Sequence, residues 1–194
     1  MIKTDQVKEL RDKTGVSIMQ CKKALEEAGG DIDKALIILK KISGDIAEKK
    51  SSRSLGAGIV EAYVHNTGNI GVLVELSSET DFVANNKEFK SLAYNIAMHV
   101  AATNPKFLKF EDISEGEKEK AKEVFKKEIE DKPDELKEKI MDGKIKSYFG
   151  EQVLLDQVYI KNPEQTVNDL ISSAVQKFGE RIEIRRFIRF STEN

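Results

Sequence analysis

The sequence has few of the residues that build metal and redox sites. Its 194 residues include one cysteine and two histidines. One cysteine excludes a disulfide within the chain, and protein zinc sites rely mainly on cysteine and histidine ligands. We therefore expect no metal ion, and nothing in the sequence indicates a cofactor.

Long apolar runs are also absent. No uninterrupted stretch approaches the roughly 18 apolar residues that a membrane span needs. The opening segment, MIKTDQVKEL, has no basic stretch followed by an apolar core, as a signal peptide would. Tryptophan is absent and proline occurs three times, which is typical of a helix-rich protein. These features predict a soluble protein of the cytoplasm, without a membrane partner.

The charge shows no excess of one sign. There are 32 lysines and arginines against 34 aspartates and glutamates, which gives a net charge of -2. A protein that coats nucleic acid usually carries a basic excess, so this balance argues against such a role. Hydrophobic residues make up 39% of the chain, enough for a core in one ordinary domain or two small ones. Specificity is therefore expected in a few local features.

The first 44 residues read as three short helices. Gly15 stands where a first helix would end, and Ser17 with Gln20 has the spacing of a capping box that begins a second. Asp31 then caps a third helix. The expected inward residues at helical spacing are Val7, Leu10, Ile18, Cys21, Ala24, Leu25, Ala28, Ile32, Ala35, Leu36 and Leu39. The pattern predicts a small three-helix domain over residues 1–44.

The periodicity then changes from helical to alternating. Residues 45–58 are polar and contain glycine, which indicates a linker. Residues 59–65 and 69–78 alternate around an Asn-Thr-Gly turn and predict a β-hairpin, and residues 180–190 predict a closing strand. We expect residues 59–194 to form an α+β core, in which helices pack on a three-stranded antiparallel sheet.

Helices are expected between these strands. Asn85 and Glu88 have capping-box spacing at the start of a strongly apolar helix, and Gly179 ends the last helix. Residues 111–143, within a helical segment 111–150, contain 13 acidic and 8 basic side chains. This composition favours a solvated helical pair lying on the core, with an acidic binding surface as the alternative.

No motif specifies a reaction. The chain has no phosphate-binding loop, dinucleotide-binding fingerprint or nucleophile elbow. Cys21 lies on an apolar stripe without a nearby histidine, so a buried structural thiol is favoured over a nucleophile. His65 and His99 also favour structural roles. A small hydrolase or transferase would need a site that the sequence does not contain.

The closing strand is the best candidate for nucleic-acid binding, because it holds Arg181, Arg185, Arg186 and Arg189. Phe187 and Phe190 differ by three positions, so a regular strand places them on opposite faces rather than on one stacking platform. The pattern favours an exposed arginine face over a buried face. The expected buried face consists of Ile182, Ile184, Ile188 and Phe190. Arg186 interrupts it and needs a carboxylate partner or solvent.

The segment ETDFVANN, residues 79–86, lies between a strand and a helix, where loops project from a rigid scaffold. An aromatic residue, Phe82, stands in this turn. It could cap the core, which composition alone favours. The alternative is an aromatic wedge that binds a partner protein.

Four blocks of the sequence resemble the elongation factor Ts family. They are KELRDKTGVSIMQCKKAL (8–25), VLVELSSETDFVANN (72–86), KIMDGKIKSYFGEQVLLDQVYIKN (139–162) and GERIEIRRFIRF (179–190). They occur in family order and span nearly the whole chain.

The resemblance implies a guanine nucleotide exchange factor for elongation factor Tu in translation elongation, with no covalent chemistry. It also implies that the first domain resembles a ubiquitin-associated (UBA) domain and binds a helix of the Tu nucleotide domain. Arg11, Ile18, Met19 and Lys22 occupy the family positions of this contact. Together they make an apolar pair ringed by cations.

The resemblance assigns a second contact to Thr80, Asp81, Phe82 and Val83. This motif would enter Tu near its Mg²⁺ and phosphate site, with Phe82 as a wedge between helices. The chain has room for one of the two core halves found in long family members. The short form implies a homodimer that binds two Tu molecules.

Overall fold

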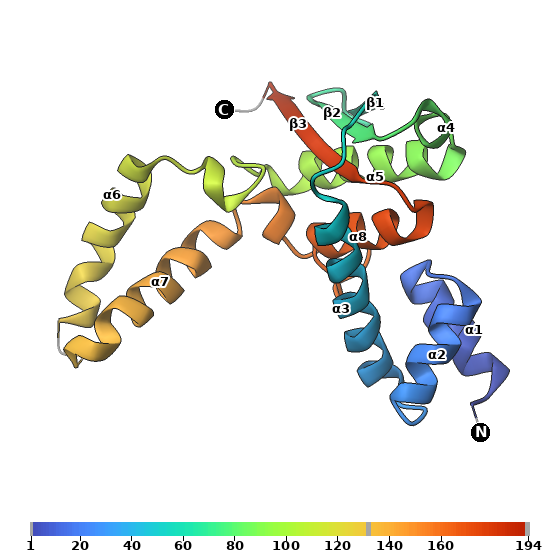
Figure 1. Cartoon of the computed structure of the whole chain (residues 1–194). Helices are drawn as coiled ribbons and strands as arrows, with labels where there is room; N and C mark the ends of the chain where they lie inside the picture. The colour runs from blue at the N-terminus through green and yellow to red at the C-terminus, as the bar shows by residue number, and fades with distance from the viewer. Residues whose placement is uncertain (1, 131–132, 193–194) are drawn as a thin grey trace.

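The computed structural model describes residues 2–130 and 133–192, and it confirms the predicted α+β class (Figure 1). Three helices come first: α1 (Thr4–Thr14), α2 (Ile18–Glu27) and α3 (Ile32–Lys50). The hairpin strands β1 (Ala57–Val64) and β2 (Ile70–Ser78) follow. The remaining elements are α4 (Asp81–Ala84), α5 (Lys87–Thr103), α6 (Glu115–Lys126), α7 (Asp134–Gly150), α8 (Val167–Phe178) and β3 (Ile182–Ser191). Short 3-10 turns occupy Phe110–Asp112, Lys127–Ile129 and Leu154–Asp156.

Predicted signals mark the end of α1 and the beginnings of α2 and α3. Gly15 adopts a left-handed conformation, with φ of 68°, at the C-terminus of α1. The Ser17 hydroxyl accepts a hydrogen bond from the Gln20 backbone N–H at 3.3 Å, and the Asp31 carboxylate accepts one from Lys34 at 3.0 Å. The small core of this region consists of Val7, Leu10, Val16, Cys21, Ala24, Leu25, Ala35 and Leu39.

Helix α3 is longer than predicted. The sequence assigned residues 45–58 to a linker, but the helix continues to Lys50. Ser43 is buried, and Ile46 and Ala47 pack against the main core at helical spacing. Serine and glycine in this stretch suggested a linker, but contact with α8 stabilises the helical conformation. One continuous helix therefore joins the N-terminal helices to the sheet region.

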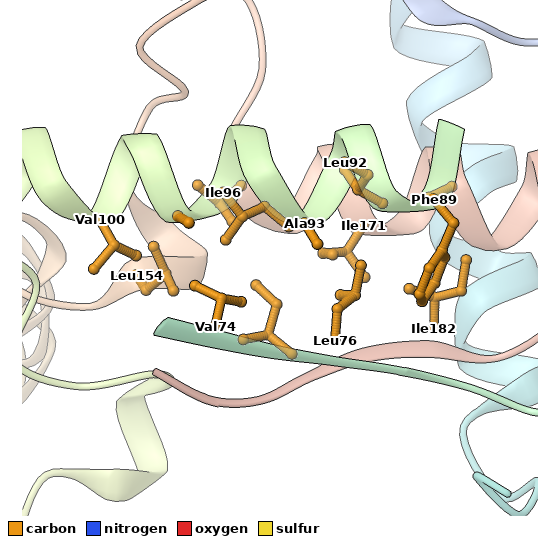
Figure 2. Packing of buried hydrophobic residues seen from close by; sticks show 14 of the residues in the cluster. Val74, Leu76, Phe89, Leu92, Ala93, Ile96, Val100, Leu154, Ile171 and Ile182 are labelled. Carbon is orange, nitrogen blue, oxygen red and sulfur yellow. The ribbon is translucent and has the colours of Figure 1, made fainter. Parts of the chain in front are cut away.

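The sheet has the order β1-β2-β3, and both pairings are antiparallel. Its inner face packs on α5 and α8, with the apolar stripe of α5 lying along β2 (Figure 2). The side chains labelled in that view are Val74, Leu76, Phe89, Leu92, Ala93, Ile96, Val100, Leu154, Ile171 and Ile182. The cap of α5 is Asn86, whose side chain accepts from the Glu88 N–H at 2.8 Å. The predicted cap, Asn85, was wrong by one position.

Strand β3 contains an irregularity that the alternating pattern did not predict. Glu75 pairs with Arg186 and Leu76 pairs with Ile184, so Arg185 is an extra residue on the β3 side. A β-bulge of this kind shifts the alternation of side chains by one.

The bulge reverses the faces of β3 beyond it. Phe187 packs against the core, whereas Ile188 is 47% exposed and Phe190 is 61% exposed. The predicted burial of Ile188 and Phe190 was therefore wrong, although Phe187 and Phe190 do lie on opposite faces. Arg186 was expected to need a carboxylate partner or solvent, and it has both: its Nε lies 2.6 Å from Glu75 Oε2, and its side chain is 82% exposed.

Helices α6 and α7 form the predicted helical pair, but they do not lie on the sheet core. They project away from the sheet as an arm (Figure 1). Their residues pack instead in a separate cluster of Ile113, Ala121, Ile145, Phe149 and Val153. On these helices, Val124 is 68% exposed and Leu136 is 49% exposed. Within residues 2–130 and 133–192, no helix has the length and apolarity needed to cross a membrane.

Candidate partner-binding site

The short helix α4 presents Phe82 to solvent. Phe82 is 82% exposed, while the next residues, Val83 and Ala84, are each 4% exposed and belong to the main core. This exposure contradicts the interpretation of Phe82 as a cap of the core. Val83 instead provides the anchor, so the turn has a buried side and an exposed aromatic side.

The residues just before α4 are held by the opposite end of the chain. Thr80 donates two hydrogen bonds to the carboxylate of Glu180: one from its backbone N–H at 3.0 Å and one from its hydroxyl at 2.6 Å. The Thr80 carbonyl accepts from the Ser78 hydroxyl at 2.9 Å. Sequence reasoning missed Glu180, because nothing local connects two residues 100 positions apart.

Glu79, on the segment before α4, makes the reciprocal contact to the segment before β3. Its carboxylate accepts from the backbone N–H of Arg181 at 2.6 Å and from the Arg53 guanidinium at 3.3 Å. These bonds, with that from Arg181 the largest contribution, hold the pKa of Glu79 below its ordinary value. The carboxylate therefore remains ionised, and the segments before α4 and before β3 are fastened to each other.

The second predicted group lies on the N-terminal helices, and all four of its residues are exposed: Arg11 on α1, with Ile18, Met19 and Lys22 on α2. Ile18 is 57% exposed and Met19 is 80% exposed. The expectation that Ile18 faces inward was therefore wrong. The exposed pair is large and apolar, and lysine and arginine side chains accompany it, which suits binding to an apolar partner surface with an acidic rim.

A groove of about 230 Å³ lies between the N-terminal helices and the main core. Gly15, between α1 and α2, forms one wall, and Glu88 and Leu92 of α5 form the other. Lys177 of α8 closes it with an ion pair to Glu88 at 3.0 Å. Gly15 comes just before α2 in the chain, and α5 comes just after α4. In Figure 1 both α2 and α4 lie on the right of the molecule.

Comparison with known proteins assigns the chain to a family. The family model described as elongation factor TS matches residues 7–194. An elongation factor Ts of Thermodesulfovibrio yellowstonii is 50% identical over 190 residues, covering 97% of this chain and 95% of its own length. That of Thermotoga petrophila is 48% identical over 189 residues, with the same coverage. That of Carboxydothermus hydrogenoformans is 47% identical over 192 residues, covering 98% of this chain and 88% of its own length.

The chain belongs to the elongation factor Ts family. The matched range includes both exposed groups, from Arg11 to Val83, and also Glu180. The family name places the protein among translation elongation factors.

The arginines of the closing strand of this elongation factor Ts family member have partners within the chain. Arg181 and Arg185 both pair with Glu183, and Arg186 pairs with Glu75. Arg189 donates a hydrogen bond to a backbone carbonyl of α5 at 3.2 Å. This pairing, with the opposite facing of the two phenylalanines, disfavours the hypothesis of an RNA-binding surface.

The buried titratable groups have structural partners. The Cys21 thiol lies 3.6 Å from the Val16 carbonyl oxygen, and burial raises its pKa above the ordinary value. His99 bonds Gln157 Oε1 at 2.8 Å through Nε2, and its Nδ1 accepts from the Ile160 N–H at 3.3 Å. The described part of the chain contains no group of three or more histidine, cysteine, aspartate or glutamate residues that could hold a metal ion.

Proposed function

We propose that this protein is a guanine nucleotide exchange factor that promotes GDP release from elongation factor Tu. The observation that carries the proposal is Phe82, a large aromatic side chain that is 82% exposed although the next two residues, Val83 and Ala84, are buried. Such a side chain contributes nothing to the core, and exposed aromatics on rigid supports are typical anchors of protein interfaces. Membership in the elongation factor Ts family supplies the partner.

The mechanism is thermodynamic coupling without covalent chemistry. GDP and Mg²⁺ stabilise one conformation of Tu, and the exchange factor binds better to a conformation that holds them poorly. By linkage, binding of the exchange factor lowers the affinity of Tu for nucleotide by a certain ratio. Bound nucleotide lowers the affinity of Tu for the exchange factor by the same ratio. Phe82 acts as a wedge between Tu helices, while Thr80 and Asp81 displace groups that order the magnesium and phosphates.

The N-terminal domain, residues 1–44, supplies a second contact. In this proposal it is UBA-like, and Arg11, Ile18, Met19 and Lys22 bind a helix of the Tu nucleotide domain. Two separate contacts would let the factor bind Tu through the N-terminal domain while Phe82 acts on the nucleotide site. The protein would work in the cytoplasm, with Tu rather than nucleic acid as its partner.

The active form in this proposal is a homodimer that binds two Tu molecules. The sheet face opposite α5 and α8 is here called the outer sheet face. Its apolar residues are Val60, Ala62, Val64, Leu73, Ile188 and Phe190, and the Glu75–Arg186 ion pair lies beside them. Val64 and Val60 are each 65% exposed, and Phe190 is 61% exposed. A sheet with apolar side chains on both faces commonly packs against a second sheet, and a second copy offers the same patch through a two-fold axis.

Release of a fluorescent GDP analogue from Tu tests the function. We expect this protein, at concentrations well below that of Tu, to accelerate release. Excess unlabelled GDP occupies the emptied site, so the labelled nucleotide does not rebind. An unchanged release rate with folded protein would refute the proposal.

A further inference from the structure

Glu180 stands at a corner of the chain. It follows Gly179, whose left-handed backbone with φ of 73° ends α8, and it precedes β3. From this corner its two carboxylate oxygens accept separate hydrogen bonds from Thr80, at 3.0 Å from the N–H and 2.6 Å from the hydroxyl. One side chain therefore holds one residue at two points.

This contact extends the sheet beyond its last paired residues. Ser78 of β2 pairs with Ile182 of β3, and the ladder ends there. Beyond it, Glu79 accepts from the Arg181 N–H, while Glu180 accepts from the Thr80 N–H. Two glutamates thus replace backbone carbonyls as acceptors. The chain leading into α4 remains tied to β3 where backbone pairing has stopped.

Helix α4 depends on this attachment. It has four residues, and a single turn is not stable by itself because helix nucleation is unfavourable. Thr80 is its N-cap residue, yet the Thr80 side chain makes no cap hydrogen bond to the helix, and its hydroxyl donates to Glu180 instead. The turn is therefore oriented by two supports: the burial of Val83 and Ala84 on one side and the Glu180 contact on the other.

We propose that Glu180 is a positioning residue for nucleotide exchange, which holds Thr80 so that Phe82 is presented to the partner in one orientation. The inference rests on the proposed function. It adds a residue that lies about 100 positions from the Phe82 motif and does not itself need to touch Tu. A preorganised wedge loses less conformational entropy when it enters the partner, so the attachment speeds the step in which the nucleotide site is disrupted.

Two substitutions separate hydrogen-bond geometry from charge. Glu180→Gln removes the charge, but its amide oxygen can accept from the Thr80 N–H and its amide group can donate to the hydroxyl oxygen. Glu180→Asp keeps the charge but is shorter by one methylene group and cannot span both atoms. We expect the Asp variant to lower the maximal GDP release rate about tenfold, and the Gln variant to stay within about threefold of wild type.

A positioning residue should affect the maximal release rate more than the affinity of the factor for Tu. The N-terminal contact remains intact, so the concentration of factor that gives half the maximal rate should change less than about twofold in Glu180→Asp. In a Phe82→Ala background, Glu180→Asp should cause no further loss, because its effect passes through Phe82. Glu128→Asp is the matched control. It shortens a glutamate that pairs with Lys144 at 2.6 Å in the α6–α7 arm, and it should leave exchange unchanged.

The outcomes are distinct. If wild type fails to accelerate release, the proposed function itself is wrong. If wild type is active and Glu180→Asp exchanges at the wild-type rate, the positioning role is wrong. Equal losses in the Asp and Gln variants, or a loss that persists without Phe82, would also overturn it. Should Glu180→Asp fold poorly by circular dichroism, Thr80→Val removes only the hydroxyl donor and should lower the maximal rate about threefold.

Discussion

At the scale of single residues, we expect Phe82 to separate binding function from stability. It is 82% exposed, so its removal leaves no cavity in the core. We expect Phe82→Ala to slow factor-catalysed GDP release from Tu at least tenfold while the melting temperature stays within a few degrees. Stopped-flow fluorescence of a labelled GDP measures the rate.

Val124→Ala is the matched control for this prediction. Val124 is 68% exposed, but it lies on the α6–α7 arm. We expect wild-type exchange in this control. A folded Phe82→Ala protein that exchanges at full rate would show that the wedge assignment is wrong.

His99 makes stability depend on pH. It is completely buried, and burial lowers its pKa below the ordinary value of about 6.5. Its Nδ1 accepts a hydrogen bond from the Ile160 N–H, so the folded state favours the neutral ring. The unfolded chain binds a proton at His99 as pH falls through about 6.5, which the folded state resists, so this contribution to stability is lost as pH falls.

The expected loss from His99 reaches at most about 1.4 kcal/mol at pH 5.5 relative to pH 7.5. Urea denaturation of wild type and of His99→Gln at both pH values measures it. Glutamine does not titrate, so the difference between the two proteins should shrink at pH 5.5. A difference that does not change with pH would contradict the assignment.

At the scale of elements, α3 joins the N-terminal helices to the sheet region as one continuous helix, and Gly44 is a glycine in its interior. Gly44 lies within α3, and a Cβ added there would have no heavy atom within 4 Å. Glycine in a helix interior is destabilising by roughly 0.5–1 kcal/mol relative to alanine. We expect Gly44→Ala to raise the free energy of unfolding by about that amount in urea denaturation.

Gly58→Ala provides the contrast for this prediction. On β1, an added Cβ would lie 2.7 Å from the Leu76 carbonyl oxygen, so the backbone must shift and stability should fall. If Gly44→Ala destabilised the protein as Gly58→Ala does, α3 would not be continuous through residue 44.

At the scale of the whole molecule, the proposed homodimer depends on the outer sheet face. Phe190→Glu places a charge in the apolar patch and should convert a dimer to a monomer, because burying an unpaired carboxylate is strongly unfavourable. Size-exclusion chromatography with light scattering measures the mass. Val124→Glu, an equally drastic change on the exposed arm, should leave the dimer intact. A wild-type monomer would refute the homodimer.

Much of the fold could be predicted because its signals are local. Caps such as Ser17 and Asp31 and the stop at Gly179 depend on backbone hydrogen bonds within a few residues. Helix α3 beyond residue 44 was not predictable in the same way. Its polar composition suggested a linker, and packing against α8 decided the conformation.

The candidate site divides along the same line. The sequence by itself determined the α+β class, the helix limits near their caps and the short motif that carries Phe82, since each depends on periodicity or on neighbours in the chain. Only the tertiary structure decided that Phe82 is exposed, that the bulge at Arg185 turns Phe190 outward, and that Glu180 holds Thr80. These features join residues far apart in the chain, and their energies arise only when the folded backbone brings those residues into contact.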